Sequence, residues 1–428
     1  MKIKFNILKN KNCSYCNEIL TKKSCNVCDP FGMIEGWTSG NLDIDKFIKD
    51  TIYDVRNSTQ NRVYEFLEWV ASDRFKDIKE IGKGGFSKVY SATWIDGKSE
   101  YYKNDGNYKK EKSKPMMKVA LKSLNGSQYM SNEYLNELKI HWNITKIFGL
   151  SLYGITKDKK TQDFMMILEF AQEGSLKSIL SRNFKNTLWK NKIKILHDTL
   201  VDLQKLHELG YFHKDFHSGN ILQVCDDVSY ISDFGLSGPA NEQKSDKNIY
   251  GVMPYVAPEV LNGKPYMSSS DIYSVGVIMA ELSSGKPPFY DKKHDLSLTL
   301  AICNGLRPEF GKGTPEFYMK LACKCMNGNS DERPTAKDLV DIFKFWYSTI
   351  SAIEVEKFGY EGKEIKEAFN EADKEIPNIS TSYEMNSGSV YVSRPFKSYN
   401  DSLLIPVDNN EDHDSNQSDL EIPQSIHN

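Results

Sequence analysis

The chain carries the stretch Phe212-His213-Lys214-Asp215-Phe216-His217-Ser218-Gly219-Asn220 and, thirteen residues after its end, the triplet Asp233-Phe234-Gly235. Three polar groups in these stretches are spaced for different tasks in the transfer of a phosphoryl group. The carboxylate of Asp215 would receive an incoming hydroxyl, while the amide of Asn220 and the carboxylate of Asp233 would hold metal ions that bridge nucleotide phosphates. Such clusters of Asp and Gly also occur in ordinary turns, so the interpretation depends on their order and spacing.

The motifs resemble those of the protein kinase family. The resemblance implies that Asp215 is the catalytic residue and that Asn220 and Asp233 bind Mg²⁺. It also implies an α+β fold of two lobes, in which a β-rich N-lobe precedes a helical C-lobe. The expected reaction is transfer of the γ-phosphoryl group of ATP to hydroxyl groups of proteins, with ATP and Mg²⁺ as cofactors.

The nucleotide end of the expected site begins at the glycine-rich turn of residues 81–90, where glycines let the backbone approach phosphate oxygens. The resemblance implies that Lys122 holds the phosphates and pairs with a glutamate of the following helix. We predict Glu137 for that role and keep Glu133, one helical turn earlier, as the alternative. The expected nucleotide contacts are Ile81, Gly82, Gly84, Val89, Ala120, Lys122, Glu169, Ala171 and Leu222.

Neighbours of the motifs depart from the family pattern. Lys214 stands where an arginine usually precedes the catalytic aspartate, and lysine offers a loop phosphate only a point charge. His217 replaces a lysine of serine/threonine kinases and is expected to act in catalysis by donating to the γ-phosphate when protonated. Val252 replaces an activation-segment threonine, and Ser87 replaces the third glycine of the turn. Tyrosine-kinase signatures are absent, so the resemblance is to the tyrosine-kinase-like branch of serine/threonine kinases.

Further residues resemble structural supports of the same fold. Glu259, in the Ala-Pro-Glu motif, is expected to form a buried ion pair with Arg333, and Asp271 is expected to cap its helix and anchor the catalytic loop. Candidate phosphorylation sites between Asp233 and Glu259 are Ser237, Ser245 and Tyr250.

Four cysteines near the N-terminus form two pairs with the spacing Cys-X-X-Cys. They are Cys13, Cys16, Cys25 and Cys28. Four thiolates in two such pairs suit a tetrahedral Zn²⁺ ion, so we expect a structural zinc site in a zinc-ribbon-like module. Unliganded reduced cysteines or a redox pair are the alternatives. The other cysteines have no comparable spacing.

The composition pattern predicts four consecutive parts. These are the zinc module (1–40), a helical lead-in (41–74), the kinase domain (75–349, with N-lobe 75–171 and C-lobe 172–349) and a charged, then largely disordered tail (350–428). The lead-in has a helical apolar pattern that includes Val63, Phe66, Leu67 and Val70. The segment 96–118 is extra to the family pattern and is expected to be a long β-hairpin. The tail beyond a helical stretch at 354–374 has few large apolar residues.

Composition limits the partners. The chain has 428 residues, 39% of them apolar, and a net charge of only −3, which argues against a dedicated nucleic-acid binder. Its apolar runs are shorter than the roughly 20 residues of a membrane-spanning helix, and we recognise no secretory signal. We therefore expect a cytoplasmic protein, with the nucleus as the alternative. Its partners would be protein substrates and a protein bound by the zinc module or the tail.

Two other function classes compete with an active protein kinase. A pseudokinase scaffold would need neither Lys122 nor the three polar groups of the opening motifs, yet all four residues are present. A kinase fold that acts on small molecules would not need the peptide-side loop from Gly251 to Glu259. The sequence therefore favours the active protein kinase.

Overall fold

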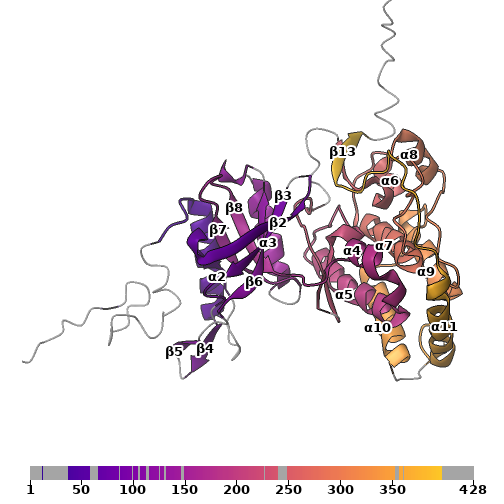
Figure 1. Ribbon diagram of the computed structural model, residues 1–428, viewed down its shortest axis with the longest axis horizontal. Coiled ribbons are helices and arrows are strands. Elements are labelled where there is room, and N and C mark those ends of the chain that lie inside the picture. Colours follow the sequence, from indigo (N-terminus) through magenta and orange to yellow (C-terminus); the bar gives the residue numbers. More distant parts are fainter. Residues whose placement is uncertain are drawn as a thin grey trace, which may run out of the picture.

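The computed structural model describes residue 12 and residues 37–57, 66–85, 87–98, 100–104, 107–111, 115–124, 126–129, 132–145, 149–225, 227–239, 248–351, 356–359 and 361–397. These residues form a sheet-based N-lobe and a helical C-lobe (Figure 1). The predicted two-lobe arrangement is thus what the structure has. None of the helices in these ranges combines the length and the apolar character that a membrane crossing requires.

The N-lobe is built on a six-stranded sheet with the order β1-β7-β8-β6-β3-β2. Its strands are β1 (Glu68–Trp69), β2 (Phe75–Lys83), β3 (Ser87–Trp94), β6 (Met117–Leu124), β7 (Leu152–Lys157) and β8 (Phe164–Glu169). The central strand β8 is apolar up to its last residue because both of its faces are covered. Phe164, Met166 and Leu168 pack into one hydrophobic cluster, and the alternating Met165 and Ile167 pack into another.

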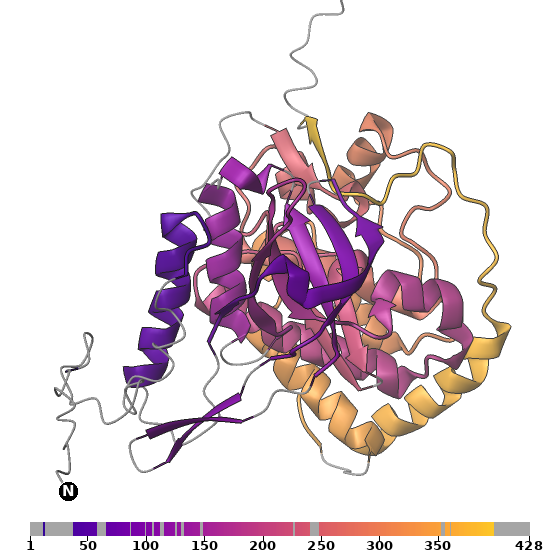
Figure 2. The same cartoon turned by 60° about the vertical axis from the view of Figure 1, so that its left-hand side comes forward.

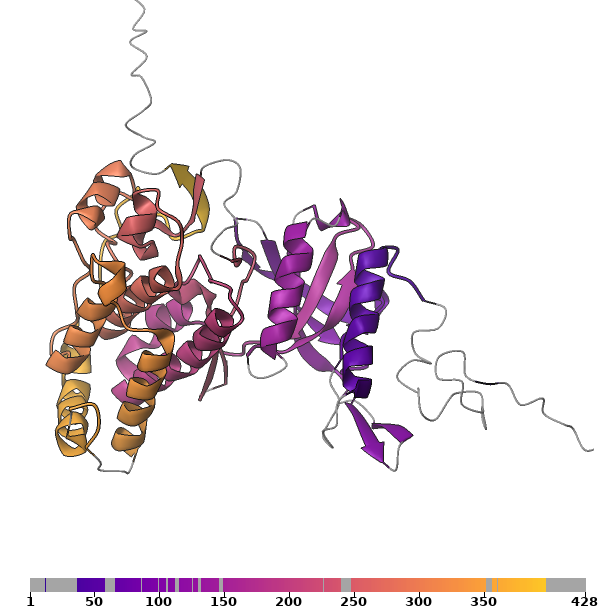
Figure 3. The ribbon, with the colours of Figure 1, turned by 180° about the vertical axis from the view of Figure 1, so that it is seen from behind.

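Two helices, α2 (Leu42–Asn57) and α3 (Asn132–Thr145), lie side by side against the sheet (Figure 3). Helix α2 begins after Asn41, whose side-chain oxygen accepts hydrogen bonds from the amides of the second and third helical residues. Ile44, Ile48 and Ile52 recur every fourth residue, and all three are buried against the sheet. This stripe explains why the segment is helical and why it docks here.

Residues 66–71, in the second half of the predicted helical lead-in, are not helical. Glu68 and Trp69 form the short strand β1, which pairs in parallel with β7, and Val70 N donates to Ile155 O at 3.0 Å. The Trp69 ring stacks on Trp37. The edge of β7 offers main-chain hydrogen bonds that a helix of this short segment could not match, so tertiary pairing overrides the helical periodicity. Val63 lies outside the described residues.

The extra segment between β3 and β6 contains an antiparallel hairpin, as predicted. Its strands are β4 (Glu100–Asn104) and β5 (Asn107–Glu111), joined in continuous register from Glu100 opposite Glu111 to Asn104 opposite Asn107. The hairpin projects away from the N-lobe sheet (Figure 1). It does not pair with the strands of the larger sheet in the part of the chain that the structure describes.

The C-lobe is mainly helical. Its helices are α4 (Leu176–Asn183), α5 (Trp189–Glu208), α6 (Pro258–Leu261), α7 (Ser268–Ser284), α8 (Leu296–Cys303), α9 (Glu316–Cys325), α10 (Ala336–Ser351) and α11 (Gly362–Glu375). Its strands are β9 (Gly174–Ser175), β10 (Ile221–Cys225), β11 (Val228–Ile231), β12 (Asn248–Gly251) and β13 (Arg394–Lys397). Helix α7 is the centre, and a Cβ added at Gly276 would lie 2.8 Å from Ala322 O of α9. The glycine therefore permits close packing of α7 and α9.

The prediction that the tail is largely disordered is wrong for residues 376–397. Helix α11 covers most of the predicted charged stretch, and Ile365, Phe369 and Ala372 are buried in the C-lobe core. The following residues run along the C-lobe to β13, which pairs with β12 (Figure 2). Burial of the apolar side chains of α11 and pairing of β13 with β12 offset the conformational entropy that this segment loses when it becomes ordered. The composition of the tail alone does not reveal these contacts. Residues 398–428 lie outside the described residues.

Candidate active site

The catalytic loop, residues 212–220, is anchored by Asp271 of α7. Its Oδ2 accepts a hydrogen bond from His213 N at 2.9 Å, and its Oδ1 accepts one from Lys214 N at 3.1 Å. The predicted anchoring is confirmed. The predicted capping is wrong, because α7 begins at Ser268 and the carboxylate is engaged by the loop. The hydroxyl of Ser270 instead accepts the hydrogen bond from Met267 N at the start of the helix.

His213 binds the main-chain amide of Asp215, and Asn220 binds its carbonyl. The His213 Nδ1 atom accepts a hydrogen bond from Asp215 N at 3.4 Å, so the ring proton is on Nε2, which donates to Ser232 O at 3.1 Å. Burial lowers the pKa of His213, which favours this neutral form. Asn220 Nδ2 donates to Asp215 O at 2.9 Å. The two predicted residues Asp215 and Asn220 are thereby held together through the backbone.

The Asp215 carboxylate lies next to His217 and Gly251. His217 Nε2 is 3.7 Å from Asp215 Oδ2, and His217 Nδ1 accepts a hydrogen bond from Gly219 N at 3.0 Å. Asp215 Oδ1 is buried and has no hydrogen-bond partner among the described residues. A Cβ added at Gly251 would be 3.4 Å from this oxygen. The structure thus gives His217 a contact with Asp215, and its contact with a phosphate stays a prediction.

Lys122 joins the two lobes through two carboxylates. Its Nζ pairs with Glu137 Oε1 of α3 and, at 2.8 Å, with Asp233 Oδ1 of the C-lobe. Burial disfavours the charged ammonium, but the two carboxylates outweigh it and raise the pKa of Lys122. Of the two glutamates considered for this pair, Glu137 is the one that meets Lys122. The side chain of Glu133 lies outside the described residues.

Asp233 and Glu137 approach each other across Gly235. A Cβ added at Gly235 would be 3.3 Å from Glu137 Oε2 and 3.3 Å from Asp233 Oδ1, so a side chain here would crowd both carboxylates. Desolvation favours protonation of Asp233, yet the Lys122 charge and hydrogen bond lower the pKa of Asp233 below its ordinary value. Burial raises the pKa of Glu137, and the Lys122 charge opposes that rise. The lysine therefore keeps Asp233 ionised beside a crowded glycine.

The apolar part of the predicted nucleotide contacts is brought together. Ala120 and Leu168 are buried in one N-lobe cluster, against which Val89 and Leu222 pack. Leu222 comes from β10 of the C-lobe, so residues of both lobes meet here. Ile81 at the end of β2 is exposed instead. The structure thus places Ala120, Val89 and Leu222 in one cluster and leaves Ile81 outside it.

The polar part of the predicted nucleotide contacts comes from the glycine-rich turn and the linker after β8. Gly84 N donates to Ser87 O at 2.8 Å, which closes the turn that begins near Gly82. Glu169 N donates to Ser151 O at 2.9 Å, and Gly174 N donates to Ala171 O at 3.3 Å. The amide of Glu169 and the carbonyl of Ala171 therefore have local partners in this structure.

The predicted ion pair between Arg333 and Glu259 is confirmed. The guanidinium donates two parallel hydrogen bonds to the carboxylate, at 2.8 and 2.7 Å, and its side chain is fully buried. Arg333 also donates to Ser269 O at 2.8 Å. Burial favours protonation of Glu259, but the hydrogen bonds from Arg333 outweigh it and lower the pKa of this carboxyl. The bidentate pair ties the Ala-Pro-Glu motif to the C-lobe.

The residues at the positions that usually control activation make contacts within the C-lobe. Lys214 Nζ donates to Pro239 O at 3.0 Å, so its ammonium holds the segment through a backbone carbonyl. Val252 is buried in the C-lobe core. Of the candidate phosphorylation sites, Ser237 is buried and donates to His213 O at 3.2 Å, and Tyr250 lies on β12. Ser245 lies outside the described residues.

The zinc ligands expected near the N-terminus also lie outside the described residues. They are Cys13, Cys16, Cys25 and Cys28. Across the ranges that the structure does describe, no group of three or more His, Cys, Asp or Glu side chains could hold a metal ion.

A buried polar cluster beneath the catalytic loop was not anticipated from the sequence. Glu281 of α7 accepts hydrogen bonds from Ser218 Oγ at 2.9 Å and from Tyr255 OH at 2.7 Å. Burial raises the pKa of Glu281 to about 7. The cluster ties the catalytic loop to the peptide-side loop, and its only sequence signal is one acid within an otherwise apolar stretch of helix.

Comparison with known proteins agrees with this geometry. A family model described as protein tyrosine and serine/threonine kinase matches residues 75–343. Similar proteins include a probable serine/threonine-protein kinase of Dictyostelium discoideum (28% identity over 64% of this chain and 15% of that protein) and another of Arabidopsis thaliana (32%, over 51% and 54%). A serine/threonine-protein kinase of Caenorhabditis briggsae is 26% identical over 62% of this chain and 50% of its own length.

The chain thus spans about half, or much less, of the length of these relatives. The part matched by the family model contains Lys122, Glu137, Asp215 and Asp233, the residues whose side chains form the core of the site. Because the family model covers more than half of the residues, this chain belongs to the protein tyrosine and serine/threonine kinase family.

Proposed function

We propose that the protein transfers the γ-phosphoryl group of ATP to serine and threonine hydroxyls of proteins, with Mg²⁺ as the metal cofactor. The proposal rests on the ion pairs that Lys122 forms with both Glu137 and Asp233. It rests also on the buried Asp215 Oδ1, which has no hydrogen-bond partner among the described residues. In a pseudokinase scaffold nothing would select for this arrangement.

The residues fit a nucleotide with its metal. Asn220 uses its amide nitrogen to hold Asp215 O, which leaves the amide oxygen as a metal ligand. Asp233 gives one oxygen to Lys122, and its side chain is 40% exposed. Bound Mg²⁺–ATP would supply the phosphoryl group. Lys122 would bind phosphate oxygens, with Glu137 keeping the ammonium in place, and Asp215 would orient the acceptor hydroxyl and receive its proton.

The preference for serine and threonine rests on the names of the similar proteins and on the absence of tyrosine-kinase signatures from the sequence. We assign the chain to the tyrosine-kinase-like branch of serine/threonine kinases on the same grounds. Because Lys214 already binds Pro239 O, we further propose that the segment keeps its place without a loop phosphate.

A peptide-library assay tests the activity. The full chain is incubated with labelled ATP, Mg²⁺ and degenerate peptides that carry Ser, Thr or Tyr as the only acceptor, with Asp215→Asn as the control. We expect Asp215-dependent labelling of the Ser and Thr libraries. Labelling of the Tyr library alone would overturn the acceptor class, and the absence of Asp215-dependent labelling would favour the scaffold.

We also propose that the four N-terminal cysteines bind one structural zinc ion. The support is their paired spacing in the sequence. Metal analysis of the purified full chain should give about one zinc per chain. Cys13→Ser/Cys16→Ser should lose it, whereas the control Cys323→Ser, on the exposed face of α9, should keep it. Equal zinc contents in the three proteins would rule the site out.

A further inference from the structure

The segment that follows α11 is attached to the C-lobe along the loop between α7 and α8. Asn386 N donates to Tyr290 O at 2.9 Å, and His294 N donates to Gly388 O at 3.1 Å. Val390 N donates to His294 Nδ1 at 3.0 Å. These bonds to the main chain and to the His294 ring fix the path of the segment before it reaches the active site.

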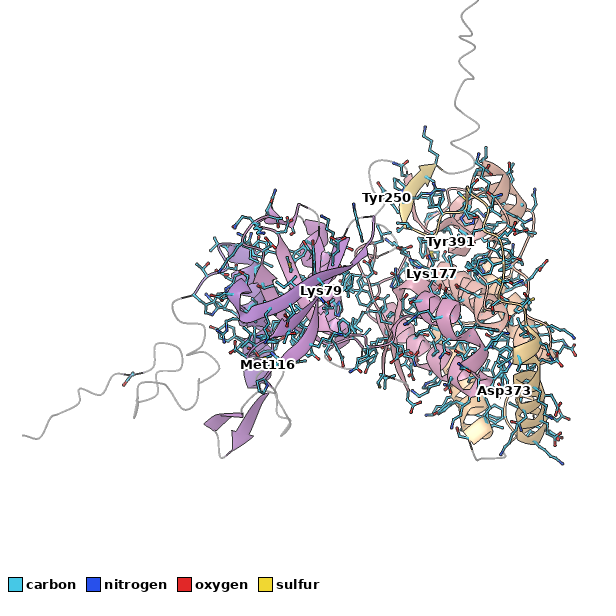
Figure 4. All side chains as sticks on the ribbon, viewed as in Figure 1. Lys79, Met116, Lys177, Tyr250, Asp373 and Tyr391 are labelled. Carbon is cyan, nitrogen blue, oxygen red and sulfur yellow. The ribbon has the colours of Figure 1, made fainter. Side chains whose placement is uncertain are left out.

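Tyr391 attaches this segment to the C-lobe through its side chain. Its hydroxyl donates to Pro288 O at 2.9 Å, and its ring packs edge-on against His294. Lys177 of α4 places its ammonium 5.0 Å from the centre of the ring. Figure 4 shows Tyr391 and Lys177 near each other, with Tyr250 of β12 close by. The anchor therefore lies just before the strand that pairs with β12.

The strand β13 extends the activation segment as an antiparallel partner. Asn248 lies opposite Lys397, and Gly251 lies opposite Arg394. Gly251 is the residue whose added Cβ would be 3.4 Å from Asp215 Oδ1. The pairing register thus puts the start of β13 opposite the glycine that adjoins the catalytic carboxylate. The residue before this start is Ser393.

Ser393 also touches the glycine-rich turn of the N-lobe. A Cβ added at Gly85 would lie 2.5 Å from Ser393 O, so the turn and the serine are in direct contact. The Ser393 hydroxyl is shielded from solvent and has no hydrogen-bond partner among the described residues. A serine hydroxyl that has no partner among the described residues therefore lies between the turn expected to cover the phosphates and the strand beside Asp215.

We infer that Ser393 is an intramolecular phosphate acceptor and that residues 391–397 occupy the place of a protein substrate. This inference rests on the proposed kinase activity. Ser393 Oγ attacks the γ-phosphorus of ATP, and a new O–P bond forms. The bond from the γ-phosphorus to the β,γ-bridging oxygen breaks, and its electron pair leaves with ADP. The hydroxyl proton passes to the Asp215 carboxylate.

The substrate class follows from the same strand. An external protein would bind as an extended segment along β12, with its acceptor serine or threonine just before the paired residues. While β13 is paired with β12, it occupies this edge, so the segment competes with external substrates. A phosphate on Ser393 would add about two negative charges against the Gly85 backbone, one residue before Arg394, which lies opposite the glycine that adjoins Asp215. The modified segment should therefore leave β12 and open the edge.

The decisive experiment maps phosphate on the full-length protein. Dephosphorylated chain is incubated with Mg²⁺–ATP at several protein concentrations, with a peptide from the active library present, and both acceptors are followed by mass spectrometry. We expect Ser393 to be labelled at a rate that does not depend on protein concentration. Ser393→Ala should lose this label and transfer phosphate to the peptide more slowly than the wild type, because its unmodified segment stays paired with β12. The matched control Ser387→Ala, an exposed serine of the same segment, should keep both the label and the wild-type rate of peptide transfer.

The experiment distinguishes a failure of this inference from a failure of the proposed kinase activity. Peptide labelling without Ser393 labelling would overturn the inference and leave the kinase activity standing. Ser393 labelling in proportion to protein concentration would overturn the intramolecular route. Labelling of neither acceptor would overturn the kinase activity and the inference with it.

A second variant tests the competition without touching the acceptor. Tyr391→Ala removes the hydrogen bond to Pro288 O and the contact with Lys177. We expect Ser393 labelling to slow, and peptide labelling to accelerate, by roughly two- to tenfold, the factor carried by one such hydrogen bond. Tyr383→Ala, which alters a more distant ring contact with Tyr290, is the control. Rates that change in the same direction for both acceptors would contradict competition.

Discussion

The variant Asp215→Asn is expected to transfer phosphate to peptides about 10² to 10⁴ times more slowly than the wild type, because an amide cannot receive the hydroxyl proton. The fold should survive the change. The bonds that hold residue 215 run through its main chain, to His213 Nδ1 and from Asn220 Nδ2. The side-chain Oδ1 has no partner among the described residues, so no hydrogen bond is lost there.

Initial rates with a saturating library peptide measure this effect, and binding of a fluorescent ATP analogue shows whether the nucleotide site is intact. Asp331→Asn, an exposed carboxylate in the turn before Arg333, is the matched control and should keep the wild-type rate. An unchanged rate for Asp215→Asn would remove the residue from the chemistry. A loss of both rate and nucleotide binding would point to a structural role instead.

The chemical residues could be predicted because most of them are close in sequence. Asp215 and Asn220 lie in one loop, and a hydrogen bond between the Asn220 amide and Asp215 O holds their spacing. For Lys122, the family resemblance called for a glutamate of the following helix, and helix geometry left Glu137 and Glu133 as candidates on one face. Motif spacing and local geometry therefore reached the core of the site.

Features that depend on distant partners could not be predicted in this way. Glu68 and Trp69 form a strand only because the edge of β7 lies beside them. Residues 394–397 have a largely polar, proline-containing sequence, yet they pair with β12, which lies far earlier in the chain. Composition carries no information about such a partner strand. Pairing with the edge of β7 or β12 makes each of these short segments a strand.

The buried cluster around Glu281 was missed for a related reason. Its members Ser218, Tyr255 and Glu281 come from the catalytic loop, the peptide-side loop and α7, and only the folded chain brings them together. A single acid in an apolar stretch of helix has no distinctive local pattern. The position of such a group becomes meaningful only when its burial and its hydrogen-bond donors are known.

The variant Asp271→Asn is expected to lower the free energy of unfolding by about 3 to 5 kcal/mol at pH 7. The two carboxylate oxygens accept four hydrogen bonds. The donors are His213 N, Lys214 N, His207 Nε2 and Tyr266 OH. Asparagine replaces one oxygen with a nitrogen that is itself a donor, so two of these donors would be left facing it in a fully buried site.

The loss should depend on pH in a defined direction. Burial favours protonation of Asp271, but the hydrogen bond and charge of His207 hold the pKa of this carboxyl below its ordinary value of 3.8. A carboxyl whose pKa is lower in the folded than in the unfolded chain stabilises the protein at pH values above its pKa in the unfolded chain. This stabilisation is lost as the pH falls through the pKa of the folded state. The difference between wild type and variant should therefore be constant near neutral pH and shrink below about pH 4.

Urea unfolding of the wild type and Asp271→Asn, from pH 7 down to the acid limit of the native state, measures this difference. Asp331→Asn is again the control, and its exposed side chain should change the free energy of unfolding by no more than about 0.5 kcal/mol. Equal stabilities at pH 7, or a difference that grows as the pH falls, would contradict the anchoring role. If the role holds, Asp271→Asn should also slow peptide transfer, because the amides of His213 and Lys214 belong to the loop that positions Asp215.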